Sequence, residues 1–202
     1  MRLSGSIGKF AATTVLLSSA IFVHAQGSGR SLNLPDFSAT QEMGNMAPGK
    51  VYRSGPNFRA EPLPGLVVIY LAASNRVYNL YSRGNCIEMP PEKSTIVPTP
   101  LQLMIGTKVE RTPGGTEVVD GHSCRVENVV VTTADGKTTH SKVWKAEDLK
   151  GAPVKIESQT EQGRVMATYR DIVLGTPDPE LFKPPSKCIP YDKMYQVAPP
   201  GK

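Results

Sequence analysis

The sequence predicts a mainly β protein built on an antiparallel sheet that is open or only partly closed. Four extended segments follow one another between residues 116 and 185, with turn residues between them. None of these segments has the 3.6-residue apolar period of a helix. In Val154-Lys155-Ile156-Glu157 apolar and charged residues alternate, so one strand face is dry and the other is wet. This alternation favours an antiparallel sheet over a parallel sheet that is buried on both faces.

Residues 1–25 have the parts of an export signal. Arg2 and Lys9 supply the positive region, an uncharged apolar core follows, and the small residue Ala25 ends the segment. The core has about fourteen residues, fewer than the roughly twenty that cross a bilayer, so an uncleaved anchor is the weaker alternative. We therefore expect a signal peptide cleaved after Ala25 and a periplasmic or secreted mature protein.

The rest of the chain is long enough for one domain. Removing the signal leaves 202 − 25 = 177 residues, which can bury a core of their own. Residues 26–36 begin with a Gly- and Ser-rich stretch and are expected to form a flexible leader. We expect a β domain over residues 37–187 and a C-terminal tail over residues 188–202.

The charge of the chain is weak and mixed. The formal charge is +5, and loss of Arg2 and Lys9 with the signal leaves 5 − 2 = +3. Lysines and acidic residues interleave between residues 142 and 157, whereas a nucleic-acid-binding domain gathers basic residues on one element. We therefore expect no nucleic-acid partner, and at most transient contact with an anionic membrane surface.

Residues 37–90 contain a series of extended runs separated by turn residues. The runs cover residues 37–45, 50–61, 66–74 and 76–90, and the turns are Ala47-Pro48-Gly49, Pro64-Gly65 and Ser74-Asn75. Residues 66–71 are nearly all apolar, as expected for a strand buried on both faces. Later in the chain, Asp135-Gly136 predicts a hairpin because both residues tolerate positive φ, and Gln162-Gly163 predicts a second one.

One short helix is predicted between the two groups of strands. Thr99 can cap its N-terminus, and Pro100 suits its first position. The apolar stripe of the helix consists of Leu101, Met104 and Ile105. Gly106 and the Pro-Gly-Gly at 113–115 limit the helix to a few turns. Such a helix is marginal alone, so we expect it to cover the dry face of the sheet as a lid.

Three cysteines, Cys86, Cys124 and Cys188, remain after export. An oxidising compartment favours one disulfide and one free thiol, and three pairings are open. Cys124 lies in the middle of an extended segment, where cysteine often serves as a small buried residue. We favour the pair Cys86–Cys188, because both residues lie at the margins of structured segments.

The order of several short motifs resembles the LolA-like periplasmic carriers, and most of all an uncharacterised branch of them. The motifs are Glu88-Met89-Pro90, Asp120-Gly121-His122-Ser123-Cys124, Trp144-Lys145-Ala146-Glu147-Asp148-Leu149 and Asp178-Pro179-Glu180-Leu181-Phe182-Lys183-Pro184. Each motif is weak alone, but their order and spacing over residues 38–186 are moderately specific.

The resemblance implies a half-open antiparallel barrel whose concave apolar face, covered by one or two short helices, takes up lipid chains. In these carriers an arginine near an Arg-Pro-Asn-x-Phe-like step helps to govern opening and closing. Here Arg53, or less directly Arg59, corresponds to it, although Ser54-Gly55 stands before the proline. The candidate cavity and lid residues are Arg53, Phe58, Arg59, Leu101, Met104, Ile105 and Trp144. We expect Trp144 to pack in the interior, where its indole N–H needs a partner.

No enzyme, metal site or cofactor is predicted. His122 and Cys124 share a strand face, but strand geometry separates them by about 7 Å, too far for the roughly 3 Å hydrogen bond of a nucleophile and its base. Zinc needs three or four converging ligands, and a remote Cys86 would have to complete such a set. A thiol-redox enzyme is disfavoured because the chain has no Cys-x-x-Cys motif.

Two functions from different classes are consistent with this pattern. The first is a non-enzymatic binding protein that holds a lipid, an acyl chain or a lipid-modified partner in an apolar cavity. The second is an envelope structural or protein-interaction domain with a filled barrel and no ligand, which contacts its partner through a sheet edge or the free thiol. A flexible Met104 in the lid suits the first function, because methionine repacks around varied acyl chains.

Overall fold

The computed structural model describes residues 34–94, 108–133, 136–160 and 163–196. Within these ranges all strands belong to one twelve-stranded sheet, in the order β12-β6-β5-β4-β3-β2-β1-β11-β10-β9-β8-β7. All neighbouring strands are antiparallel except β12 and β6, which are parallel. The predicted mainly β, antiparallel fold is confirmed. The predicted helix with Leu101, Met104 and Ile105 lies outside the described residues.

The strands fall into two groups of different length. The short-strand limb consists of β1 (Phe37–Glu42), β2 (Gly49–Ser54), β3 (Asn57–Leu63), β4 (Leu66–Leu71), β5 (Arg76–Tyr81) and β6 (Cys86–Met89). The long-strand limb consists of β7 (Lys108–Val119), β8 (His122–Thr132), β9 (Thr138–Ala146), β10 (Ala152–Thr160) and β11 (Gly163–Leu174). The remaining elements are η1 (Pro91–Lys93), η2 (Pro179–Phe182), β12 (Ile189–Pro190) and η3 (Tyr191–Gln196).

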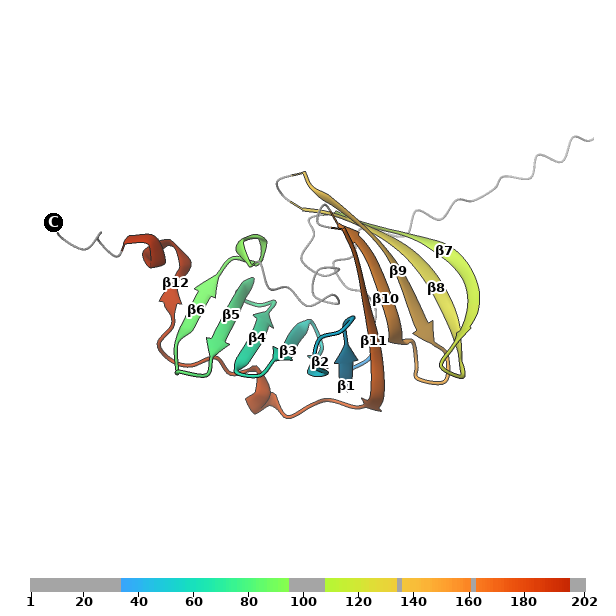
Figure 1. Cartoon of the computed structure of the whole chain (residues 1–202), viewed down its shortest axis with the longest axis horizontal. Coiled ribbons are helices and arrows are strands. Elements are labelled where there is room, and N and C mark those ends of the chain that lie inside the picture. Colours follow the sequence, from blue (N-terminus) through green and yellow to red (C-terminus); the bar gives the residue numbers. More distant parts are fainter. Residues whose placement is uncertain (1–33, 95–107, 134–135, 161–162, 197–202) are drawn as a thin grey trace, which may run out of the picture.

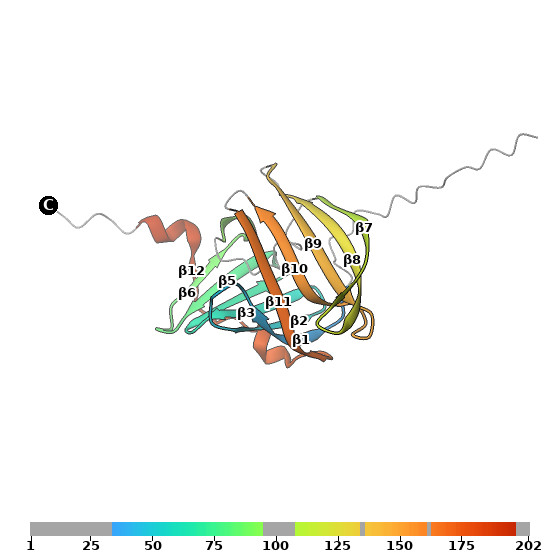
Figure 2. The ribbon, with the colours of Figure 1, turned by 45° about the vertical axis from the view of Figure 1, so that its right-hand side comes forward.

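The sheet curls so that the two limbs face each other, as Figures 1 and 2 show. One cluster of buried side chains draws on strands of both limbs, so the face that carries it is the inner face of the curve. We call these residues the inner cluster; they include Phe37, Val51, Phe58, Val68, Val77, Val129, Val143, Ile156 and Tyr169. Among the described strands, the two edges β7 and β12 do not pair with each other, so the barrel is half open. The half-open antiparallel barrel that the sequence resemblance implied is thus present in the described residues.

Most of the predicted turns are present. Gly65 has φ +80° between β3 and β4, and a Cβ there would lie 2.9 Å from the Cβ of Ser82, so both space and backbone require glycine. Asn75, which has φ +51°, turns the chain between β4 and β5. β8 and β9 pair as the predicted hairpin requires, and Gly136 has φ +83°, while Asp135 lies outside the described residues. The single run expected over residues 50–61 is instead a second hairpin, split between β2 and β3.

The Pro-Gly-Gly at 113–115, which was expected to limit the predicted helix, lies within a strand. β7 runs through it, because the ladder to β8 resumes after a bulge: Pro113 pairs with Glu127, and the next pair is Thr116 with Arg125. A Cβ on Gly114 would lie 2.9 Å from a methyl carbon of Val126, so glycine lets the bulged strand approach its neighbour.

After β11 the chain passes back beneath the short-strand limb to the far edge of the sheet (Figure 1). On the way η2 packs against β3 and β4, where Phe182 is buried. Cys188 then forms the predicted disulfide with Cys86, and β12 pairs with β6. Residues 188–196, expected to be part of a tail, therefore belong to the fold, because the disulfide fixes them to β6. Cys124 is free and buried, as predicted.

The end of the expected leader is also part of the fold. Leu34 is buried, and the guanidinium of Arg53 donates to its backbone carbonyl. The carboxylate of Asp36 accepts hydrogen bonds from the Gly55 backbone N–H at 2.6 Å and from the Thr176 hydroxyl at 3.0 Å. These contacts tie the start of β1 to the β2–β3 turn and to the end of β11.

Candidate functional site

The inner face is the largest apolar surface that both limbs build together. Its side chains alternate with those of the outer face, as β11 illustrates. Ala167 and Tyr169 belong to the inner cluster, whereas Met166, next to Ala167 on the same strand, points outward and is 45% exposed. Val165 has the inner parity and is 37% exposed, because it lies toward the open end of β11. The inner face is thus mostly apolar, and its edge near Val165, which we call the rim, is partly exposed to solvent.

Several polar side chains interrupt this apolar face, and three contacts pair them. The amide of Gln41 donates to the hydroxyl of Tyr169 at 3.0 Å. The hydroxyls of Ser141 and Ser158 lie 2.8 Å apart on neighbouring strands. Burial raises the pKa of Tyr169, and the hydrogen bond from Gln41 opposes that rise, so the phenol stays neutral and can serve as a donor. The third contact joins Lys145 to Glu127 at 2.9 Å.

Four other buried polar atoms on this face have no hydrogen-bond partner in the part of the chain that the structure describes. They are Gln41 Oε1, Arg53 Nε, Asn79 Oδ1 and Glu127 Oε2. Three of the four are acceptors. A buried acceptor without a partner is unfavourable by about 1–3 kcal/mol, so native proteins usually supply water or a ligand to it.

Arg53, a predicted site residue, lies on the inner face and is 5% exposed. Its Nη1 donates to the carbonyl of Pro35 at 2.9 Å and approaches the carboxylate of Asp36 at 3.5 Å. Burial lowers the pKa of Arg53, and Asp36 partly opposes that shift. The guanidinium therefore holds the segment before β1 against β2. Phe58, the second predicted residue, lies beside it in the inner cluster and is fully buried.

Arg59 does not face the cavity, contrary to the expectation. Successive residues of a strand point to opposite faces, and Phe58 and Ala60 take the inner one. The guanidinium of Arg59 instead binds Glu61 at 2.7 Å and donates to the backbone carbonyl of Leu181 at 2.9 Å. It therefore anchors η2 on the outer face.

Trp144 also lies away from the expected interior. Its neighbour Val143 belongs to the inner cluster, so Trp144 points to the opposite face of β9. There it joins a second group, which we call the outer cluster: Cys124, Val126, Trp144, Ala146 and Val154. The indole N–H donates to the carboxylate of Glu117 at 2.8 Å, and the ammonium groups of Lys142 and Lys155 lie 4.7 and 4.4 Å from the ring centroid.

His122 and Cys124 do not form a hydrogen bond between their side chains in the described structure. His122 lies 2.7 Å from the carboxylate of Asp148, and the Cys124 thiol donates to the backbone carbonyl of His122 at 3.4 Å. Burial raises the pKa of Cys124, so its reactive thiolate form is disfavoured. Within the described ranges, no group of three or more His, Cys, Asp or Glu side chains converges as a metal site would require. The same ranges contain no helix with the length and apolar character needed to span a bilayer.

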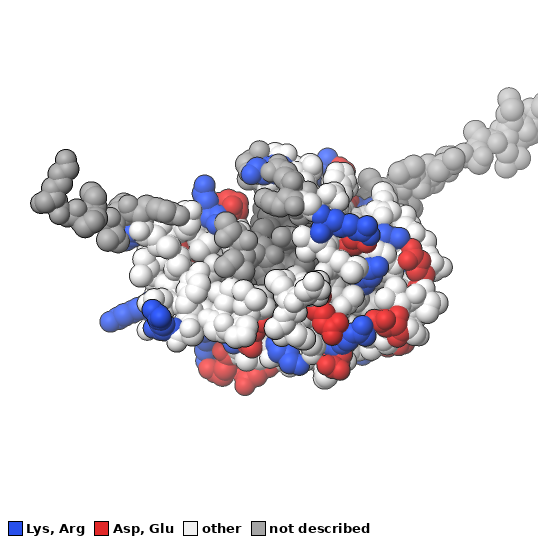
Figure 3. Space-filling view, viewed as in Figure 1, with Lys and Arg blue, Asp and Glu red and all other residues white. Residues whose placement is uncertain are grey.

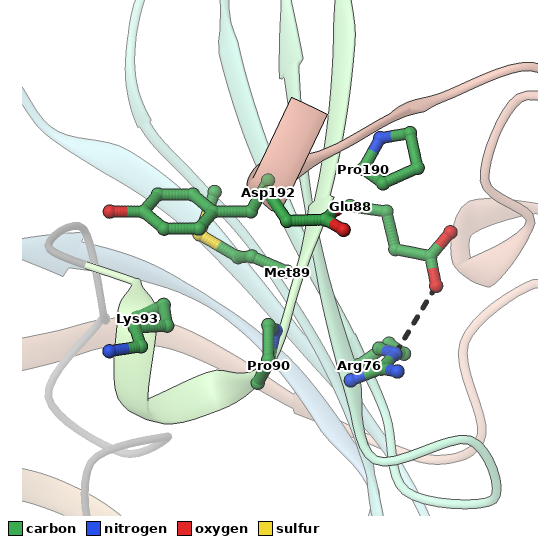
Figure 4. A pocket seen from close by; sticks show the side chains of 8 residues that line it. Arg76, Glu88, Met89, Pro90, Lys93, Pro190 and Asp192 are labelled. Atoms are coloured by element: carbon green, nitrogen blue, oxygen red, sulfur yellow. Dashed lines mark ion pairs between the residues drawn. The ribbon is translucent and has the colours of Figure 1, made fainter. Parts of the chain in front are cut away.

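A pocket of about 450 Å³ lies at the β6 edge, beside the inner face. Arg76 and Glu88 form an ion pair of 3.3 Å on one side of it, and Lys93 and Asp192 contribute further charges (Figure 4). Met89 lines this pocket and also belongs to the inner cluster. On the face seen in Figure 3, charges of both signs lie side by side over the long-strand limb, while the short-strand limb is mostly uncharged.

Reasoning from the sequence did not identify Gln41 and Asn79 as candidate residues. Asn79 gave a weak signal: it takes an inward position in β5, two residues after the buried Val77. A polar residue at an inward position of an otherwise apolar face is a departure from alternation that could have singled it out.

No protein-family model matches this chain, and no curated protein sequence matches it. Solved structures resemble it at low identity. The LolA superfamily protein from Nitrosomonas europaea has 12% identity and a TM-score of 0.45, with 75% of this chain and 91% of that one covered. The lipoprotein LppX of Mycobacterium tuberculosis has 16% identity and a TM-score of 0.38, with 69% and 87% covered. A protein of a family of unknown function from Desulfovibrio piger has 9% identity and a TM-score of 0.37, with 74% and 88% covered.

Proposed function

We propose that this protein is a non-enzymatic binding protein that holds an acyl chain or another lipid against its inner face. The observation that carries the proposal is the mostly apolar inner face of a half-open sheet, with a rim at which Val165 stays 37% exposed. A concave apolar surface with few polar groups is the usual form of a site for small apolar ligands.

The energetics favour an acyl chain as the occupant. Each buried methylene contributes about 0.8 kcal/mol, so eight methylenes contribute about 6 kcal/mol. The polar pairs on the inner face, Gln41–Tyr169 and Ser141–Ser158, need no rearrangement to line such a chain. A lipid-modified protein would present the same chemistry through its acyl chains.

The protein acts outside the cytoplasm under this proposal. The Cys86–Cys188 disulfide supports an oxidising compartment, in agreement with the signal expected over residues 1–25. The small positive charge of the chain allows brief contact with an anionic membrane surface, where lipids are available.

Two neighbouring residues of β11 provide the test. Val165→Asp places a charge on the inner rim, while Met166→Asp makes a similar change on the outer face, where Glu157 is its ladder partner. We expect the purified protein to bind a fluorescent fatty-acid analogue, and Val165→Asp to weaken that binding at least about 10-fold, which corresponds to about 1.4 kcal/mol. Met166→Asp should bind the probe as the unchanged protein does.

Mass spectrometry of the natively purified protein provides a second measurement. Bound lipid released by organic solvent supports the proposal. Absence of any extracted lipid, together with absence of probe binding, would contradict it and favour the filled-barrel interaction domain. Equal loss of binding in both β11 variants would place the probe outside the inner face.

A further inference from the structure

The side chain of Asn79 is buried among apolar neighbours on the inner face. Asn79 is 2% exposed, and its ladder partners are Val68 on β4 and Ile87 on β6. Among the described residues its amide nitrogen approaches the sulfur of Met89 alone, at 4.0 Å, which is a weak contact. Its Oδ1 has no partner within the described residues. An amide in this position lowers stability unless something else binds it.

Gln41 repeats the pattern on β1. It is 2% exposed, its Nε2 donates to Tyr169, and its Oε1 has no partner in the described part of the chain. The two carboxamides therefore offer the same chemistry, a buried oxygen that can accept a hydrogen bond. Leucine has nearly the shape of asparagine and would satisfy packing alone, so packing does not explain an amide at either place.

We propose that the polar part of the ligand donates hydrogen bonds, and that the Asn79 carboxamide oxygen accepts one of them. This inference rests on the proposed function, and it specifies the ligand class: an amphiphile whose head carries hydroxyl or amide N–H groups, rather than a hydrocarbon or a simple ester. Gln41 is a second acceptor of the same kind.

Met89 adapts the surroundings of Asn79 to a polar head. It contacts Asn79 and also lines the pocket of about 450 Å³ (Figure 4). Arg76 and Glu88, which bring charge to that pocket, have the opposite strand parity to Asn79 and Met89, so their ion pair lies on the outer face. The thioether of Met89 is flexible enough to make room for a head group at Asn79 while the acyl chain follows the inner face.

The test compares two ligands with the same acyl chain. 1-Monolauroylglycerol carries two hydroxyl donors, and methyl laurate carries none. Each is used to displace the fluorescent fatty-acid analogue from the full protein. We expect 1-monolauroylglycerol to bind about 3- to 10-fold more tightly, the range for one hydrogen bond between neutral groups.

The variant Asn79→Leu should reduce that preference to near unity while leaving the affinity for methyl laurate unchanged. Asn128→Leu is the matched control, because Asn128 is an exposed residue of β8 that pairs with Lys142 on the outer face. Gln41→Leu reports whether the second acceptor contributes, and the ligand comparison on the unchanged protein needs no variant at all.

Each outcome decides the inference. Equal affinity for the two ligands in the unchanged protein would overturn it and leave the proposed function intact. An Asn79→Leu protein that keeps its preference would also overturn it, since Asn79 would then hold only water. Failure of both ligands to displace a bound probe would overturn this inference alone, whereas a probe that does not bind the unchanged protein would overturn the proposed function together with it.

Discussion

The inner and outer clusters lie on opposite faces of the long strands. They differ in whether the buried polar groups beside them have hydrogen-bond partners. In the outer cluster the indole of Trp144 donates to Glu117, which also binds Lys142 at 2.6 Å. On the inner face, Gln41 Oε1 and Asn79 Oδ1 are buried without a partner among the described residues. Of the buried atoms that lack a partner in the described ranges, none belongs to the outer cluster.

This difference supports the proposal that the inner face, rather than the outer cluster, binds a ligand. A buried acceptor without a hydrogen-bond partner lowers the stability of a folded protein. A cluster in which every buried polar group has a partner therefore needs no ligand to complete its hydrogen bonds. Unpaired acceptors on a concave apolar face indicate a contact that a ligand or water completes. Trp144 was a predicted cavity residue. In the structure its indole N–H already has an acceptor in Glu117, and two lysine ammonium groups lie over its ring, as is typical of a structural residue.

The largest expected effect is a loss of stability when a buried side chain is shortened, and it should be greater in the inner cluster than in the outer cluster. Phe58→Ala should lower the free energy of unfolding by about 3–5 kcal/mol, because Phe58 is fully buried in the inner cluster. Val126→Ala in the smaller outer cluster should lower it by about 1–3 kcal/mol. Denaturant titration measures both, with Leu63→Ala, at a 46% exposed position, as the control. Equal losses at Phe58 and Val126 would contradict the ranking.

A smaller effect should have opposite signs in the two clusters. Asn79→Leu should raise the free energy of unfolding of the ligand-free protein by about 1–3 kcal/mol, because it removes a buried acceptor without a partner. Glu117→Leu should lower it, because the buried indole of Trp144 loses its acceptor. Thermal melting of both proteins tests the pair. A loss of stability in Asn79→Leu would mean that its oxygen is already satisfied.

The smallest effect concerns fluorescence from Trp144, the chain's single tryptophan. Its emission should not change when 1-monolauroylglycerol binds, because Trp144 lies in the outer cluster. Hydrogen bonds from Lys142 and Trp144 lower the pKa of Glu117. The folded pKa thus lies below the unfolded one, so the carboxylate's contribution is complete above about pH 4.3 and is lost as pH falls through the folded pKa.

An acid titration of the emission should accordingly show its transition at a lower pH than an ordinary glutamate carboxyl would give, because the pKa of Glu117 is lowered. The Glu117→Leu protein serves as the reference, because it has no carboxylate to titrate at this place. A spectral shift on ligand addition at neutral pH would instead place the ligand against the outer cluster and restore Trp144 as a ligand residue.

Much of the strand pattern could be predicted because its causes are local. The alternation in Val154-Lys155-Ile156-Glu157 appears in the structure as buried and half-buried positions in turn. Gly65 and Asn75 turn the chain as their conformational freedom indicated. The bulge at residues 113–115 could not be predicted in this way, because its acceptance depends on the partner strand β8 and on the space above Val126.

The site residues also include some that local sequence could predict and some that depend on the tertiary structure. The sequence by itself determined an apolar sheet face, because period is a property of the chain; it favoured Cys86–Cys188 among three open pairings and a buried Cys124, and the structure confirmed both. Only the tertiary structure decided that Phe58 points inward and Arg59 outward, because alternation defines two faces without saying which one the sheet curls around. The neighbours of Asn79 on β4 and β6 are close in sequence, but only the folded sheet shows that its amide oxygen is buried without a partner among the described residues.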